Sequence, residues 1–166
     1  VRDLLLGLDR IEQGSDALVL GTDNVFTWSL ADLVAFAATR RPAATVAIRE
    51  APSREAAKRC AVVEIDGQAR LMRCREKPSA PTSQTVAVCV YYFPASVHHR
   101  LREFVNAGGN VDAPGYFLEW LVNQESVYGF LTDGEWFDVG SLETYYQVRS
   151  RYRSPASPGR ICQTEI

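Results

Sequence analysis

Short apolar runs that stop at turn residues alternate along this chain with segments of helical periodicity. Residues 17–20 (Ala-Leu-Val-Leu) form a continuous apolar run, which is typical of a strand that is covered on both faces. The run ends in the turn residues 21–24, and Ser29 then precedes apolar positions 30, 33, 34 and 37, which share one helical stripe. Because serine is a favoured N-cap, this pattern predicts a helix that begins directly after Ser29.

The remaining runs extend the alternation of strands and helices. Strands are predicted at 45–48, 62–65, 69–72 and 86–93, and Asp66-Gly67 predicts a tight hairpin turn in which the glycine adopts a positive φ. A second hairpin is predicted from 127–132 and 135–139, with its turn at 133–134. Further helices are predicted after Ser96, after 112–115 and after Ser141, the last reaching about residue 152. This order predicts an α/β fold with a mixed sheet.

Composition places the chain among ordinary folded proteins. Its 166 residues are 46% hydrophobic and 23% charged, with a net charge of -2. No broad basic surface for nucleic acid is indicated, and no apolar run approaches the ~20 residues needed to cross a membrane. We expect one domain over 1–152 and a flexible tail over 153–166, because 154–159 are rich in serine and proline.

The cysteines favour a reducing compartment. Cys60, Cys74, Cys89 and Cys162 are widely spaced and form no C-x-x-C pair, so neither a metal knuckle nor a disulfide framework is indicated. We therefore expect a cytoplasmic protein in which each cysteine is a small apolar residue.

Acidic residues follow three of the predicted strands. Ligands of α/β sheets bind beyond the carboxyl ends of strands, and Asp23, Glu76 and Asp138 lie at such positions. Two aspartates from distant strands can hold Mg²⁺ while substrate phosphates complete its coordination. Taken singly, each residue is equally compatible with turn chemistry, in which the side chain bonds nearby backbone N–H groups.

Six short segments occur in a fixed order between residues 4 and 150. They are 18–26, 62–67, 75–78 with Pro81 shortly after, 90–94, 112–117 and 134–140. In this order and at these distances they resemble the sugar-1-phosphate nucleotidyltransferase family, above all its glucose-1-phosphate thymidylyltransferase-like members. The resemblance implies a Rossmann-like α/β fold with a mixed sheet.

The resemblance also implies a reaction and its partners. In the family, a phosphate oxygen of a sugar 1-phosphate attacks the α-phosphorus of a nucleoside triphosphate in the presence of Mg²⁺, giving a nucleotide sugar and pyrophosphate. For this chain the implied pair is dTTP and glucose 1-phosphate. Transfer between two polyanions depends on charge neutralisation and in-line positioning, which a metal and a lysine supply.

Family roles carry over to individual positions. Asp23 and Asp138 match the metal-binding aspartates, and Lys77 matches the lysine that contacts the sugar phosphate. Glu76 matches the carboxylate that accepts bonds from sugar hydroxyls. The remaining substrate-binding positions that the resemblance implies are Asn24, Cys60, Ala61, Tyr91 and Trp136.

The chain departs from the family pattern in two respects. No glycine-rich triphosphate loop and no strand leading into it precede Asp23, since Gly7 and Gly14 are isolated in a helix-like stretch. We therefore expect no turnover by this chain alone, and self-association through an uncovered strand edge. In addition, Cys60-Ala61 replaces a common Tyr-Gly, and Cys89 replaces a common glycine, which predicts a narrower sugar pocket.

Two other interpretations remain open at this point. One is a non-catalytic or regulatory relative that binds a sugar phosphate or a partner chain. The other is a glycosyltransferase of similar architecture; such enzymes usually carry Asp-x-Asp, whereas residues 22–24 here are Thr-Asp-Asn.

Overall fold

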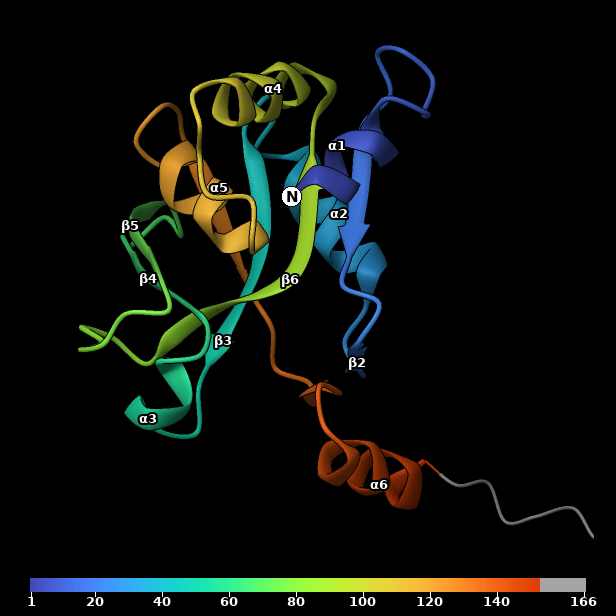
Figure 1. Ribbon diagram of the computed structural model, residues 1–166, viewed down its shortest axis with the longest axis vertical. Coiled ribbons are helices and arrows are strands. Elements are labelled where there is room, and N and C mark those ends of the chain that lie inside the picture. Colours follow the sequence, from blue (N-terminus) through green and yellow to red (C-terminus); the bar gives the residue numbers. More distant parts are fainter. Residues whose placement is uncertain (153–166) are drawn as a thin grey trace, which may run out of the picture.

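The computed structural model describes residues 1–152, and its centre is a mixed six-stranded sheet (Figure 1). The strand order is β5-β4-β6-β3-β7, with β1 paired to β6. The pairing of β3 with β7 is parallel and all other pairs are antiparallel, as the prediction of a mixed sheet requires. The six strands are β1 (Ala17–Leu20), β3 (Ala44–Glu50), β4 (Ala61–Ile65), β5 (Leu71–Glu76), β6 (Thr85–Phe93) and β7 (Val127–Leu131).

Strand β6 organises the sheet because it is long enough to hold three neighbours. One of its edges pairs with β3, while the other pairs with β1 over residues 90–93 and with β4 over residues 86–87. Among the described residues, β1 pairs with β6 alone, so its second edge has no strand beside it. Leu18 and Leu20 on β1 are correspondingly exposed, at 37% and 39%.

Helices cover both faces of the sheet. Residues 87, 91 and 93 of β6 face a core built with α1, α4 and α5, whereas residues 88, 90 and 92 face α2. This alternation is the period of two that a strand imposes on its side chains. The helices are α1 (Arg2–Leu8), α2 (Leu30–Ala38), α3 (Arg54–Ala57), α4 (His98–Asn106), α5 (Pro114–Leu121) and α6 (Leu142–Arg151).

The predicted hairpin over 127–139 is wrong, because its two strands belong to different sheets. Strand β7 lies parallel to β3, and β8 (Trp136–Asp138) pairs antiparallel with β2 (Asn24–Phe26) in a small second sheet. Gly134 lets the connecting loop pack against the start of α2, since a Cβ there would lie 2.9 Å from the backbone nitrogen of Trp28. In Figure 1, α6 continues from β8 away from the main sheet.

Helix caps follow the sequence at two of the three predicted positions. The hydroxyls of Ser29 and Ser141 accept hydrogen bonds from Asp32 N–H (3.2 Å) and Thr144 N–H (3.1 Å). Ser96 does not cap α4. It lies within the 3-10 turn Ala95–Val97, and its hydroxyl donates to the Pro42 carbonyl at 3.3 Å.

The turn between β4 and β5 differs in detail from the prediction. Its positive φ is at Ala69 (64°) and not at Gly67. The Asp66 carboxylate closes the turn by accepting hydrogen bonds from the N–H groups of Gln68 (2.8 Å) and Arg70 (2.9 Å). The side chain of Asp66 therefore fixes a five-residue connection, 66–70, that a two-residue Asp-Gly turn does not describe.

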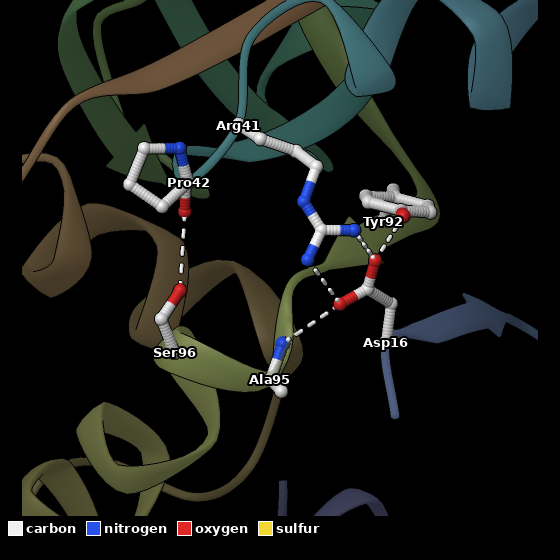
Figure 2. A network of polar contacts seen from close by, with 6 residues as sticks. All are labelled: Asp16, Arg41, Pro42, Tyr92, Ala95 and Ser96. Atoms are coloured by element: carbon white, nitrogen blue, oxygen red, sulfur yellow. Dashed lines mark hydrogen bonds and ion pairs between the residues drawn. The ribbon is translucent and has the colours of Figure 1, made fainter. Parts of the chain in front are cut away.

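Asp16 ties the beginning of β1 to the rest of the fold (Figure 2). Its carboxylate accepts hydrogen bonds from Tyr92 Oη, from Arg41, and from Ala95 N–H at 3.1 Å. These contacts anchor β1 to β6 and to the loop that leads into β3. The network lies at the amino end of β1, and the opposite end of that strand leads to Asp23.

Two expectations concern the ends of the molecule and its surroundings. The tail expected over 153–166, which includes Cys162, lies outside the described residues. Within residues 1–152, no helix combines the length and apolar character that crossing a membrane would require.

Candidate functional site

A cavity of about 240 Å³ lies beyond the carboxyl end of β1. Its walls come from the turn after β1, the beginning of β4, the end of β5, the middle of β6, the beginning of α5 and β8. The structure brings every site residue named from the sequence to this one cavity: Asp23, Asn24, Cys60, Ala61, Glu76, Lys77, Tyr91, Trp136 and Asp138.

The small sheet of β2 and β8 places Asp23 and Asp138 side by side. Asn24 is the register partner of Asp138, and Val139 N–H donates to the Asp23 carbonyl at 2.8 Å. Burial raises the pKa of Asp138, and the negative charge of Asp23 raises it further. A divalent cation bound here would offset the cost of placing the charged Asp138 carboxylate beside Asp23.

Asn24 links Asp23 to Trp136 through its side-chain amide, beside the acidic corner formed by Asp23 and Asp138. Its Nδ2 donates to Asp23 Oδ1 at 2.7 Å, and its Oδ1 accepts from Trp136 Nε1 at 2.6 Å. Because both ends of the amide bond to protein atoms, Asn24 orients Asp23 and Trp136 in this structure.

Glu76 points a buried carboxylate into the cavity. Its side chain is 6% exposed, and its oxygens accept no hydrogen bond from any residue in 1–152. Burial raises the pKa of this carboxyl, and the positive charge of Lys77 opposes that effect. The backbone N–H of Glu76 donates to Glu119 on α5 at 2.9 Å, which fixes the position of the residue. A buried acceptor with free lone pairs is suited to hydroxyl donors of a ligand.

Lys77 occupies an uncommon backbone conformation at the end of β5. Its φ is 45°, in the left-handed region that residues with side chains rarely adopt outside functional sites. Its N–H donates to the Cys60 carbonyl at 3.0 Å. Its Nζ lies 3.9 Å from oxygens of both Glu76 and Asp112, farther than a hydrogen bond. The ammonium group therefore retains its donors for an added anion.

The apolar wall of the cavity contains one phenol and two thiols. Tyr91 is 4% exposed, and burial raises its pKa well above the ordinary value. Burial also raises the pKa of Cys60 and Cys89, and the charges of Asp138 and Asp23, respectively, add to the effect. All three groups are therefore protonated at neutral pH, and the cysteines line the site as neutral side chains.

A second cavity, of about 620 Å³, adjoins the first one. The two share the side chains of Arg59, Cys60, Trp136 and Asp138, and the larger one extends between α3 and the beginning of α6. Sequence reasoning did not single out Arg59. Its position directly before Cys60 is the signal that could have drawn attention to it.

The donor set fits Mg²⁺ only when a substrate contributes ligands. In the described part of the chain, no group of three or more His, Cys, Asp or Glu residues is arranged to hold a metal ion. Asp23 and Asp138 supply two carboxylates, and Mg²⁺ commonly binds through one or two carboxylates together with substrate phosphates and waters. These two residues are the ones that would hold the ion.

Comparison with known protein families shows to which family the chain belongs. The model of the nucleotidyl transferase family matches residues 3–154. The chain belongs to the nucleotidyl transferase family. The resemblance seen in the six sequence segments is thereby confirmed.

Individual relatives act on different nucleotides by name. Glucose-1-phosphate adenylyltransferase of Thermosipho africanus is 25% identical over 146 residues, which are 87% of this chain and 35% of that protein. A Bacillus anthracis structure assigned as a glucose-1-phosphate thymidylyltransferase, in complex with sucrose, has a TM-score of 0.73 at 17% identity and covers 96% of this chain and 62% of that one. A UDP-glucose pyrophosphorylase complexed with UDP-glucose has a TM-score of 0.74 at 19% identity, over 90% and 60% of the two chains.

The comparisons show a common fold and a difference in chain length. The solved structures share the mixed α/β fold with this chain, which confirms the expected fold class. The chain spans 35% of the length of the adenylyltransferase and less than two thirds of each solved structure.

Proposed function

We propose that this chain forms the sugar-phosphate side of a sugar-1-phosphate nucleotidyltransferase site. The observation that supports the proposal is the convergence of Asp23, Glu76, Lys77 and Asp138 on one cavity. A sugar phosphate needs hydroxyl acceptors and a phosphate-binding cation, and Glu76 and Lys77 offer these side by side.

In this proposal each residue acts on a defined part of the substrate. The Lys77 ammonium donates to the phosphate of the sugar 1-phosphate and holds its attacking oxygen in line with the α-phosphorus of the triphosphate. The Glu76 carboxylate accepts hydrogen bonds from sugar hydroxyls, and buried Tyr91 packs beside the ring. Asp23 and Asp138 are the residues that would hold Mg²⁺, and the ion would supply charge neutralisation at the α-phosphate of the transferred nucleotidyl group. The new oxygen–phosphorus bond forms as the bond to the β-phosphate breaks, and pyrophosphate leaves.

The identity of the two substrates is a finer part of the proposal. We propose glucose 1-phosphate and dTTP as the pair, on the likeness of the sequence segments to the thymidylyltransferase-like members. Cys60, Ala61 and Cys89 add side-chain atoms at the sugar-facing wall, so the pocket favours compact ligands. Free thiols at Cys60, Cys74 and Cys89 are consistent with reaction in the reducing cytoplasm.

Binding of the sugar phosphate and catalytic turnover place different requirements on the chain. The 166 residues include no glycine-rich segment of the kind that cradles the triphosphate in the family, and the relatives described above are longer. We therefore propose that this chain alone binds glucose 1-phosphate without releasing pyrophosphate from dTTP.

Isothermal titration with glucose 1-phosphate in Mg²⁺ buffer tests the proposal. We expect saturable binding, weakened at least about tenfold by Lys77→Ala, because a hydrogen bond to a charged group contributes roughly 1.5–3 kcal/mol. Lys58→Ala is the matched control, since Lys58 pairs with Glu55 outside the cavity. Wild-type protein that fails to bind, or a Lys77→Ala variant that binds as tightly as wild type, contradicts the proposal. Pyrophosphate release by the isolated chain contradicts its second part.

A further inference from the structure

Arg59 stands at the passage between the two cavities. It follows α3 and precedes β4, and it lines both the cavity that holds Lys77 and the larger one that reaches α6. Asp138 also lines both cavities. A ligand that extends from the smaller cavity into the larger one therefore comes close to both Arg59 and Asp138.

The guanidinium of Arg59 has no partner within the described chain. It forms neither an ion pair nor a hydrogen bond with any residue of 1–152, although other arginines do so, among them Arg41, Arg75, Arg100, Arg102 and Arg151. Its charge nevertheless acts on the site, since it lowers the pKa of Asp138 against the larger effect of burial. An unpaired cation thus lies at electrostatic range of the acidic corner.

The two cations of the site differ in their surroundings. Lys77 lies 3.9 Å from each of two carboxylates, Glu76 and Asp112, whereas no carboxylate of residues 1–152 lies within ion-pair distance of Arg59. A guanidinium presents a planar fork of donors that matches two phosphate oxygens at once, and a lysine ammonium acts as a point charge. Arg59 is therefore suited to bind phosphate oxygens in a way that Lys77 is not.

We propose that Arg59 is a phosphate-binding residue that holds phosphate oxygens of the substrate at the junction of the two cavities. This inference rests on the proposed function, in which the smaller cavity receives a phosphorylated ligand. The phosphate belongs either to the sugar 1-phosphate or to the pyrophosphate portion of the triphosphate, and separate titrations distinguish these sources.

Two ligands and three arginine variants test this role. Glucose 1-phosphate and inorganic pyrophosphate are each titrated, with Mg²⁺, into wild type, Arg59→Ala, Arg59→Lys and Arg54→Ala. Arg54 begins α3, the short helix that precedes Arg59; it is exposed and lines neither cavity, so its variant is a matched control for lost surface charge. We expect Arg59→Ala to weaken at least one ligand by about tenfold or more, with Arg59→Lys intermediate and Arg54→Ala unchanged.

The outcomes separate this inference from the proposed function. Equal binding of both ligands to wild type and Arg59→Ala overturns the role of Arg59. If Lys77→Ala still weakens glucose 1-phosphate in that case, the proposed function stands without it. Absence of binding to wild type overturns both. A melting temperature of Arg59→Ala equal to that of wild type shows that any loss is not caused by unfolding.

Discussion

Gly115 lies where α5 crosses the end of β5, and the site has no room for a side chain at this position. A Cβ there would lie 1.8 Å from Glu76 Oε2 and 3.1 Å from Ala61 Cβ, whereas real Cβ atoms essentially never approach another atom within 3.0 Å. Gly115→Ala must therefore displace the Glu76 carboxylate by roughly an ångström or more, or lift α5 away from the sheet.

The expected effect follows from which of the two parts moves. Overpacking a well-filled site destabilises a protein by about 1–3 kcal/mol. The smaller value applies if Glu76 turns into the adjacent cavity, and the larger one if α5 moves, because Phe117 and Leu118 of that helix are 1% exposed in the core. Since each kcal/mol changes the melting temperature by roughly 2–4 °C in a domain of this size, we expect a decrease of about 2–12 °C. Binding of glucose 1-phosphate should weaken in either case.

Thermal unfolding followed by circular dichroism measures this effect against two comparisons. Gly7→Ala is a matched control, because Gly7 lies within α1 and a Cβ there would meet nothing within 4 Å. Alanine is the better helix former by about 0.5–1 kcal/mol, so this variant should be slightly more stable than wild type. In the Glu76→Ala background the clashing carboxylate is absent, and Gly115→Ala should then cost much less stability.

A Gly115→Ala variant with the melting temperature and ligand affinity of wild type would refute the close packing of Gly115 against Glu76. An effect of Gly115→Ala that is equally large in the Glu76→Ala background would show that the helix collides with something other than the carboxylate.

Three further predictions concern separate parts of the molecule. Lys77→Gly should be more stable than Lys77→Ala by about 1 kcal/mol, because a φ of 45° suits glycine, and equal melting temperatures would contradict this. Partial burial would by itself raise the pKa of Asp16, but hydrogen bonds from Tyr92 and Ala95 and the charge of Arg41 bring it below 3.8. The charge of Asp16 therefore stabilises the fold at neutral pH, and this contribution is lost as the pH falls through the lowered pKa. Asp16→Asn should be less stable than wild type at pH 7, and the difference in stability should shrink in acid. A difference that stays constant with pH would argue against this linkage. The outer edge of β1 is unpaired among the described residues, so wild type should self-associate in sedimentation. Replacing the exposed Leu18 by lysine should shift the protein towards monomer. A monomeric wild type would exclude association through this edge.

Local signals explain which parts of the fold were predictable. The strand at 17–20 and the caps at Ser29 and Ser141 depend on neighbouring residues, and the structure places them as predicted. The partners of β7 and β8, by contrast, lie far away along the chain. Two apolar runs around Asp133-Gly134 look like a hairpin, although the first pairs with β3 and the second with β2.

The candidate site was readable where its residues belong to recognisable segments. Asp23, Lys77 and Asp138 each lie within one of the six family-like segments, and all three line the same cavity. Arg59 lies outside those segments; its place directly before Cys60 hints at the smaller cavity, but that it also lines the larger one depends on the folded structure. That the Asn24 amide joins Asp23 to Trp136 depends on the pairing of β2 with β8, which the hairpin prediction did not contain.

Metal binding at the pair formed by Asp23 and Asp138 is the central claim, and paramagnetic Mn²⁺ in place of Mg²⁺ tests it directly, because both ions favour carboxylate and phosphate oxygens. With glucose 1-phosphate present, we predict that Mn²⁺ broadens the backbone amide signals of residues 22–24 and 137–140 before all others, and that Asp138→Asn abolishes this selective broadening. Broadening centred elsewhere on the molecule, or unchanged in Asp138→Asn, would contradict the account.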